Sequence, residues 1–350
     1  MRKPASILLG LFALAGMSPV EGQQRSGSFR EQARVERVVV DAYVLDPRGD
    51  PIPNLMSHDF RLRVDGRPVA IESAEWIPAD RPEALPFLVR SPSGALLPTA
   101  PEMPPGRLLI FFFQTDQFVE ARLHGLMRMA LQARQMLDTL LPTDRVAVLS
   151  FDSHLKLRQD FTADHAKLEV AIRKAILTGP PPDPDPEAFP SLARSFDFLA
   201  AKKAITPEKA LAIISKAAIP IVGAKSMVFF GWGLQTIGGA SGPNPKDMRD
   251  FREAIPALTA ARISIFTLDI TDADYHTLEG TLENISEITG GTYQKTHIFP
   301  RLAIERVSRA ISGHYEIVFA KPNLPRGWHG IDVALAARKG RVLARAAYED

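Results

Sequence analysis

The feature that most constrains the fold is an alternation of apolar strands with amphipathic helices that begins at Leu108. The run RLLIFFF is apolar at successive positions, as in a strand covered on both faces of a sheet. The stretches DRVAVLSFD, LKLRQDF, KSMVFF and RISIFTLD also have strand character, and we expect LKLRQDF to lie antiparallel to the strand before it. The pattern predicts a doubly wound, mostly parallel α/β sheet with helices on both faces.

Helix boundaries in this region follow from capping residues. Thr206-Pro207-Glu208 supplies an N-cap, a proline at the first helical position and an acid in the first turn. Thr162 is the expected cap of a helix through Leu177, and Gly290-Gly291 is expected to end another. The helix after the first strand should bury an apolar stripe, which consists of Val119, Leu123, Leu126, Met127, Ala130, Leu137 and Leu141.

Both ends of the chain contain strand patterns without helices. The stretch VERVVVDAYVL is apolar on both faces, and Asp65-Gly66 provides the positive φ angles of a tight turn between two further strands. After Gly313 the stretches HYEIVFA, GIDVALAA and RVLARAAY repeat this character. Neither end has enough strands to be stable alone. We therefore predict one β-sandwich-like unit made from the N- and C-terminal strands.

These patterns predict a division of the chain into five segments. Residues 1–22 resemble a secretory signal, with a basic start, a short apolar stretch and small residues before the cleavage position. The other four are an N-terminal β unit (33–78), a proline-rich connector (79–106), the α/β domain (107–312) and C-terminal strands that pair with the N-terminal unit (313–350).

Composition restricts the partners and the compartment. The chain has 42 basic and 40 acidic residues without long basic runs, so we expect no nucleic-acid partner. It has no cysteine, which excludes disulfides, thiolate metal ligands and a lipoprotein anchor. We expect an exported protein, periplasmic or extracellular, without stable membrane insertion once the signal is cleaved.

Ligands of open α/β sheets bind outside the carboxyl ends of the strands. In this chain that edge should include the residues after RLLIFFF, the Pro-Asp loop at 180–186 and the glycine-rich loop at 231–242. Trp232 is expected to be an exposed contact, with burial against the core as the alternative. The predicted ligand-binding rim consists of Gln114, Thr115, Asp116, Phe118, Trp232, Gln235 and Thr236.

The combination of core and flanks resembles a known family. The stretches LLPTDRVAVLSFD and ISEITGGTYQ are similar to von Willebrand factor type A domains. The flanking stretches VVVDAYVLDPRGDPIPNL, HDFRLRVDGRPVAI, SGHYEIVFAKPN and ARAAY resemble the secreted von Willebrand factor A related proteins abundant in Acidobacteria, over about residues 33–350. The resemblance implies export and a type A fold, while the function of that family is largely undefined.

The resemblance also implies where a metal would bind. Type A domains hold Mg²⁺ through Asp-x-Ser-x-Ser after the first strand, because this ion needs several hard oxygen ligands. The matching positions here are Gln114-x-Asp116-x-Phe118, and the central strand ends in Gly231-Trp232-Gly233 rather than in an acid. We therefore expect no cofactor and a degenerate metal site; if a metal binds, its ligands would be Asp116, Asp183 and Asp185.

Other acids and histidines show no recognised catalytic pattern. Asp152, Asp269 and Asp272 follow predicted strands and could face the same edge, although strand-end acids usually cap turns or helices. The sequence contains neither a His-Glu-x-x-His motif nor a Gly-x-Ser-x-Gly elbow.

The function predicted from these features is a secreted, non-enzymatic module that binds a protein partner or mediates adhesion, without metal. Two alternatives stay open at this point. One is a metal-dependent binder or hydrolase that uses Asp116 with loop acids. The other is a structural component of the envelope whose β unit matters more than the rim.

Overall fold

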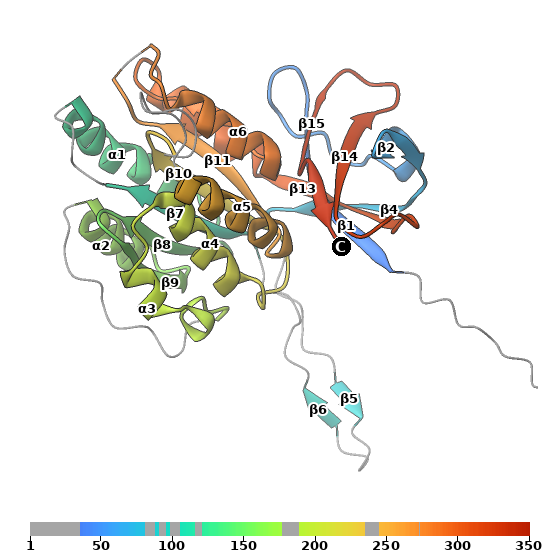
Figure 1. Ribbon diagram of the computed structural model, residues 1–350, viewed down its shortest axis with the longest axis horizontal. Helices are drawn as coiled ribbons and strands as arrows, with labels where there is room; N and C mark the ends of the chain where they lie inside the picture. Colours follow the sequence, from blue (N-terminus) through green and yellow to red (C-terminus); the bar gives the residue numbers. More distant parts are fainter. Residues whose placement is uncertain are drawn as a thin grey trace, which may run out of the picture. The chain divides into compact units, whose positions relative to one another are not determined.

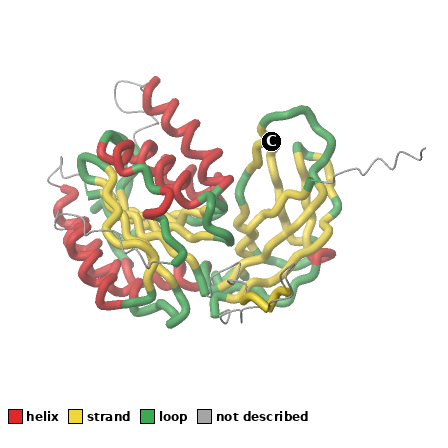
Figure 2. Tube along the Cα trace, turned by 90° about the horizontal axis from the view of Figure 1, so that it is seen from below, coloured by secondary structure: helices red, strands yellow, loops and turns green. Residues whose placement is uncertain are grey.

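The computed structural model describes residues 36–80, 88–90, 96–98, 106–115, 121–176, 189–234, 245–272 and 274–350 (Figure 1). They form a six-stranded sheet flanked by helices, two four-stranded antiparallel sheets and a two-stranded sheet. Figure 2 shows helices on both sides of the six-stranded sheet. Within these ranges, no helix has the length and apolar character needed to cross a membrane.

The six-stranded sheet has the order β12-β11-β10-β7-β8-β9. Its strands are β7 (Leu108–Gln114), β8 (Arg145–Phe151), β9 (Leu155–Thr162), β10 (Lys225–Gly231), β11 (Ile263–Asp269) and β12 (Tyr293–Lys295). All neighbouring pairs are parallel except β8 and β9. Counted along the chain, this order is 3-2-1-4-5-6 from β9 to β12, which is that of a doubly wound sheet. The predicted fold class is therefore confirmed, including the antiparallel strand, while β12 was not predicted.

Helices connect and cover these strands. They are α1 (Ala121–Leu137), α2 (His165–Ile176), α3 (Phe198–Lys202), α4 (Pro207–Ala218), α5 (Pro245–Ala260), α6 (Glu279–Thr289) and α7 (Pro300–Ala310), with a 3-10 turn η2 (Ala193–Ser195) before α3. Thr206 caps α4 by accepting a hydrogen bond from the amide of Lys209, and Gly290 ends α6 at a φ of 80°, both as predicted. The predicted cap of α2 is wrong, because Asp164 accepts from the first-turn amides in place of Thr162.

The core of the α/β part is organised by alternation along its strands. On β7, Leu108, Ile110 and Phe112 belong to the cluster on one face of the sheet. Leu109, Phe111 and Phe113 belong to the cluster on the opposite face. All six are nearly inaccessible to solvent, so both faces of β7 must be covered by helices.

The buried stripe of α1 differs from the one predicted. The helix buries Met129, Gln132, Ala133, Met136 and Leu137, whereas Met127 is 71% exposed. The predicted stripe followed the commonest spacing of apolar residues; it is confirmed at Leu137 and wrong at Met127. A helix that packs in the apolar cluster on one face of the sheet and also contacts α2 and α7 carries apolar residues over a broad arc, so periodicity locates the centre of its buried face poorly.

The two ends of the chain build the two four-stranded sheets. One has the order β15-β1-β13-β4, made of β1 (Arg37–Leu45), β4 (Ile71–Pro78), β13 (Gly313–Ala320) and β15 (Arg341–Ala344). The other has the order β16-β14-β2-β3, made of β2 (Phe60–Val64), β3 (Arg67–Val69), β14 (Trp328–Leu335) and β16 (Ala347–Glu349), with the 3-10 turn η1 (Ser57–Asp59) before β2. Side chains of both sheets share one apolar cluster, which makes a β-sandwich.

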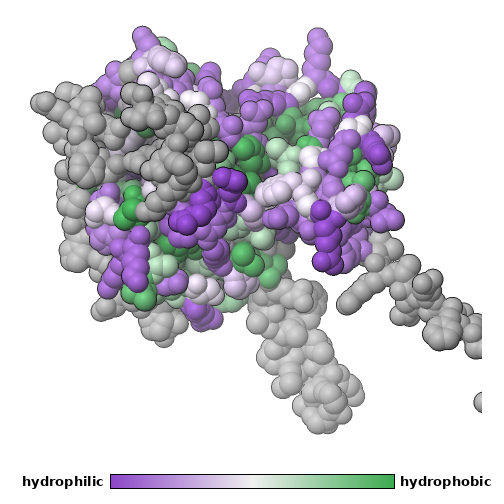
Figure 3. All heavy atoms as spheres, viewed as in Figure 1, coloured by the Kyte–Doolittle hydropathy of each residue, from purple (hydrophilic) through white to green (hydrophobic). Residues whose placement is uncertain are grey.

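Asp65 and Gly66 both have positive φ, as expected for the turn between β2 and β3. Within the proline-rich connector, β5 (Leu88–Arg90) pairs with β6 (Leu96–Pro98), so this segment is not wholly without strands. On the face seen in Figure 3, polar residues cover much of the described surface and apolar residues form separate patches.

Strand β1 joins the sandwich to the α/β part. Val40, Ala42 and Val44 lie in the sandwich core, whereas Tyr43 and Leu45 belong to a cluster of the α/β core. The Tyr43 hydroxyl lies 2.9 Å from the Ser226 hydroxyl at the start of β10. Alternation along one strand thus places the two cores back to back.

A buried ion pair lies beside this strand. Arg262, just before β11, donates to both carboxylate oxygens of Asp41, one of them through Nε at 2.9 Å, and it also contacts Glu316 at 3.3 Å. Burial by itself would raise the pKa of Asp41, but the hydrogen bond and charge of Arg262 outweigh it, so the pKa lies below its ordinary value. The carboxylate is therefore held ionised inside the molecule.

Lys225 is buried close to this pair. Its ammonium group donates to the carbonyl oxygens of Ile221 at 2.6 Å and Gly223 at 2.7 Å, and the residue is 1% exposed. Burial, followed by the nearby charge of Arg262, lowers the pKa of Lys225 to about 7. The lysine is thus poised to lose its proton near neutral pH.

We expect Asp41→Asn to lower the free energy of unfolding by about 3 kcal/mol, because it leaves the charge of Arg262 buried without its main partner. Urea denaturation measures this loss. The matched control is Asp332→Asn, which changes an exposed acid in β14 and should leave stability nearly unchanged. Equal stability of the two variants would contradict the importance of the buried pair.

The protonation of Lys225 makes stability depend on pH. The unfolded state has a lysine pKa near 10.5 and the folded state one of about 7, so between these values the unfolded state binds more protons. The free energy of unfolding should therefore rise by about 2 kcal/mol from about pH 7 to about pH 9. In Lys225→Met this rise should be much smaller, whereas the exposed control Lys203→Met should keep it.

Candidate functional site

The order of the six-stranded sheet reverses between β7 and β10, the first and fourth strands of the α/β part. At such a point the connections leave in opposite directions, and ligands of doubly wound sheets bind at the carboxyl ends of these strands. Gln114 ends β7 and Gly231 ends β10. These two residues therefore define the place where a ligand would be expected first.

The side chain of Gln114 fills the switch point between the ends of β7 and β10. The residue is 1% exposed. Its Oε1 accepts from the amide of Trp232 at 3.1 Å, and its Nε2 donates to the carbonyl oxygen of Gly233 at 3.0 Å. Gly231 is required for this approach, since a Cβ there would lie 2.6 Å from Oε1. The amide of Gln114 links the ends of β7 and β10 and is already engaged on both sides.

The other described residues of the predicted rim are also buried. Thr115 is fully buried, and its amide donates to the carbonyl oxygen of Phe151 at 2.7 Å. Trp232 is 2% exposed, so the expectation of an exposed contact is wrong and the alternative, burial, holds. Val228, Phe230 and Trp232 belong to one cluster, because the alternation of β10 continues through Gly231. That alternation in the sequence could have predicted the burial of Trp232.

The remaining predicted residues lie outside the described ranges. These are Asp116, Phe118, Asp183, Asp185, Gln235 and Thr236. Their role in ligand or metal binding stays a prediction.

The described residues at the switch point do not fit a Mg²⁺ site. Gln114 offers one neutral oxygen that is already bonded to a backbone amide, and Gly231 has no side chain. Mg²⁺ prefers charged oxygen ligands in near-octahedral geometry. Elsewhere in the described part of the chain, no group of three or more histidines and acids is arranged to hold a metal ion.

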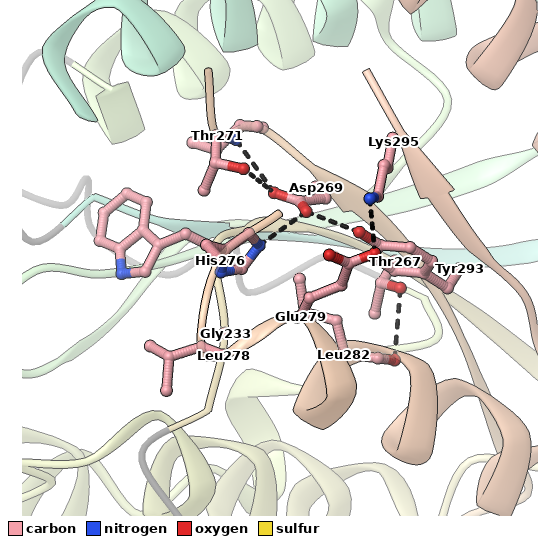
Figure 4. Close-up of polar contacts among 12 residues, drawn as sticks. Gly233, Thr267, Asp269, Thr271, His276, Leu278, Glu279, Leu282, Tyr293 and Lys295 are labelled. Carbon is pink, nitrogen blue, oxygen red and sulfur yellow. Dashed lines mark hydrogen bonds and ion pairs between the residues drawn. The ribbon is translucent and has the colours of Figure 1, made fainter. Parts of the chain in front are cut away.

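A second cluster lies at the same edge of the sheet, at the end of β11. Asp269 is 2% exposed and its carboxylate accepts four hydrogen bonds (Figure 4). Oδ1 accepts from the amide of Thr271 at 3.0 Å and from its hydroxyl at 2.8 Å. Oδ2 accepts from Nε2 of His276 at 2.8 Å and from the hydroxyl of Tyr293 at 2.7 Å. We call these four residues the Asp269 hub.

The Asp269 hub connects the loop after β11 to the first residue of β12 through hydrogen bonds. Burial and then the bond to Asp269 raise the pKa of the Tyr293 hydroxyl, which therefore stays a donor at all physiological pH values. Because both carboxylate oxygens are filled by donors of the same chain, the hub fixes loop conformation rather than presenting a free base. The sequence showed an acid at the end of a buried strand, which indicates a position at the edge of the sheet. It did not indicate the partners of Asp269, which lie 2 to 24 residues further along the chain.

Four further contacts tie the loop after β11 and the start of α6 to the end of β12 and the segment that follows it. Lys295 pairs with Glu279 at 2.7 Å and donates to the carbonyl oxygen of Asp274. His297 lies 3.0 Å from the Asp274 carboxylate, and the hydroxyl of Thr296 donates to the carbonyl oxygen of Asp269 at 2.6 Å. The two loops are thereby held as one surface.

Helix α1 supports this surface from the side. Arg128 donates to the carbonyl oxygens of Ile270 and His297, each at 3.3 Å, and pairs with Asp272. Gly125 allows the close approach, because a Cβ there would lie 2.5 Å from the Ile270 oxygen. A large side chain at this position would push α1 away from the loop.

Three large side chains on the supported segments are exposed to solvent. They are Tyr275 at 76%, Ile298 at 58% and Phe299 at 66%, and we call them the β11–β12 rim. Residues after β11 and β12 share the carboxyl edge of the sheet because these strands are parallel. None of the three was predicted from the sequence as a site residue. An exposed aromatic in a loop cannot be told from a buried one without the tertiary fold.

Comparison with known proteins adds only distant similarities. No family model and no curated protein matches the chain. Among solved structures it is similar to the conserved hypothetical protein BatB from Bacteroides thetaiotaomicron, with a TM-score of 0.39 and 13% identity over 59% of this chain and 98% of the other. It is also similar to a von Willebrand factor type A protein from Catenulispora acidiphila, with a TM-score of 0.39 and 12% identity over 85% and 74% of the two chains.

A third similar structure is the von Willebrand factor domain of the type V pili tip protein Mfa5 from Porphyromonas gingivalis. Its TM-score is 0.32, with 11% identity over 61% of this chain and 96% of the other. Two of the three descriptions name a von Willebrand factor domain. Membership in the secreted family of Acidobacteria stays a prediction.

We expect Asp269→Asn to lower the free energy of unfolding by roughly 2 kcal/mol, because one carboxylate oxygen becomes an amide that faces two donors. The loop at 271–278 should then be cut faster by proteases under native conditions, which mass spectrometry of the fragments measures. The control is Asp138→Asn, an exposed acid at the end of α1. An unchanged cleavage rate in Asp269→Asn would contradict the role of the hub.

Proposed function

We propose that the chain is an exported, non-enzymatic module that binds a protein partner at the β11–β12 rim without a bound metal. The observation that carries this proposal is the exposure of Tyr275, Ile298 and Phe299 on segments held by the Asp269 hub. Large apolar and aromatic side chains at the surface are costly unless they are few or covered by a partner.

Rigidity of the supporting segments favours binding by this rim. Interface anchors bind best when their positions are set before the partner arrives, because less conformational entropy is lost. Tyr275 directly precedes His276, a member of the hub, and Ile298 directly follows His297, which lies against Asp274. Tyr275 and Ile298 are thus each one residue from a side chain already held by hydrogen bonds, and Phe299 is two residues from His297.

The metal-free part of the proposal is supported by Gln114. At the switch point its amide binds the backbone of Trp232 and Gly233 where a metal-dependent site would need open oxygens. Export is supported by the pattern of residues 1–22. The absence of an enzymatic role is part of the proposal and rests on the same arrangement, in which the polar groups of the hub bind one another.

The test is capture of partners from the native cell envelope by cross-linking with the full chain, followed by affinity measurement for the partner identified. We expect Tyr275→Ser, Ile298→Ser and Phe299→Ser each to weaken that affinity roughly tenfold or more, as for anchor residues of interfaces. The measurement is repeated with and without EDTA, and we expect no difference.

Matched controls are available elsewhere on the α/β part. The exposed fraction of Ile205 is 61%, similar to that of Ile298. The exposed fraction of Leu199 is 66%, the same as that of Phe299. Ile205→Ser and Leu199→Ser should leave the affinity unchanged. Equal losses in rim and control variants would contradict the proposed surface, and loss of binding with EDTA would contradict its metal-free part. Partner capture that survives all rim changes but needs the sandwich would favour a structural role.

A further inference from the structure

His329 in β14 faces a hydrogen-bond acceptor at each of its two ring nitrogens. Nδ1 lies 2.8 Å from Oδ2 of Asp65, and Nε2 lies 2.9 Å from the carbonyl oxygen of Pro325. The residue is 5% exposed, so water cannot easily replace either acceptor. A neutral imidazole carries a single N–H and can satisfy one of them, whereas the imidazolium ion satisfies both. The geometry therefore selects the protonated ring.

The two acceptors belong to different segments of the sandwich. Asp65 lies in the turn between β2 and β3, where its Oδ1 also accepts from the amide of Gly330 at 2.8 Å. Pro325 lies in the segment 321–327, between β13 and β14. The amide of Gly327 in that segment donates to Asp350 at 2.8 Å. His329 thus joins the turn of the β2–β3 hairpin to the segment 321–327.

This arrangement also links the two sheets. Lys321 contacts Asp350 at 3.1 Å on one side and Glu36 at 2.8 Å on the other. Glu36 immediately precedes β1 of one sheet, and Asp350 follows β16 of the other. A loosening of the segment 321–327 would therefore weaken the contacts of Lys321 with Glu36 and Asp350, which link the two sheets.

The charges that face His329 come from several elements. Asp65 and, at 3.6 Å from Nε2, Asp350 favour its protonated form, and Lys321 neutralises part of the charge of Asp350. The ring of Tyr348 lies 5.2 Å away. Arg67 and Arg326 act at longer range on Asp65 and Glu36. The bond to Asp65, as the largest cause, raises the pKa of His329 above its ordinary value.

We propose that His329 is a pH-sensitive clasp that holds the segment 321–327 on the sandwich while it is protonated and releases that segment when it loses its proton. The single N–H of the neutral ring stays with the Asp65 carboxylate, which is the stronger acceptor. Nε2 then turns a lone pair toward the Pro325 carbonyl oxygen, and the two repel each other. The bond to Asp65 survives and the bond to Pro325 is lost.

The raised pKa of His329 decides whether the clasp is more stable in acid or in alkali. Because the pKa of His329 is raised in the folded state, the clasp contributes its full stability below the unfolded histidine value of about 6.5. That contribution is lost as the pH rises through the folded value. The clasp is thus closed in acid and opens toward alkaline pH.

The experiment is an NMR titration of the wild-type chain combined with amide hydrogen exchange. We expect the His329 ring to titrate above about pH 6.5. Above that transition the exchange of the Gly327 amide, corrected for its intrinsic pH dependence, should rise roughly threefold to tenfold, the value of one hydrogen bond. The Gly330 amide, which is bonded to Asp65, should keep its protection and serves as an internal control.

Two variants separate the clasp from a general effect of pH. His329→Gln should remove the pH dependence at Gly327, while His58→Gln, an exposed histidine of the same sandwich, should retain it. If His329→Gln does not fold, the ring titration and exchange of the wild-type chain still decide the matter. Titration at or below about pH 6.5, or exchange of Gly327 that does not follow the titration, overturns the proposal.

Discussion

The burial of both faces of β1 is the constraint on which the rest of the structure depends. Its even-numbered residues Val40, Ala42 and Val44 complete the sandwich, and Tyr43 and Leu45 complete a core of the α/β part. A single strand can serve two cores only because its side chains alternate between opposite directions. The ion pair of Asp41 with Arg262 lies at this strand, so the joint contains a charge-dependent contact as well as apolar packing.

This joint leaves the opposite, carboxyl edge of the six-stranded sheet available for binding. The side chains at that edge differ from one strand to the next. At the switch point Gln114 and Trp232 are turned inward and bind or pack against their own chain. Further along, beyond β11 and β12, the polar groups are again turned inward, but they hold Tyr275, Ile298 and Phe299 in the solvent. The proposed binding surface is therefore displaced from the usual ligand position by two strands.

Particular residues show why some predictions succeeded and others did not. The strands β7, β8, β10 and β11 were evident because runs such as RLLIFFF are buried on both faces and need no partner to be recognised. Thr206 and Gly290 were predicted correctly since capping depends on neighbours within one turn. The three residues of β12 were missed because so short a strand is defined by its pairing with β11. The cap of α2 was misassigned by two residues, a distance that only backbone geometry resolves.

By itself the sequence determined the fold class, the pairing of strand-rich ends around an α/β core and the neutral residue at the position of Gln114. These properties depend on local patterns of apolar residues, turns and residue types. The tertiary structure alone decided that Asp269 gathers Thr271, His276 and Tyr293, and that His329 lies between Asp65 and Pro325. The last pair of contacts includes residues 264 positions apart. Contacts of that kind are set by packing of the whole chain, and no local pattern records them.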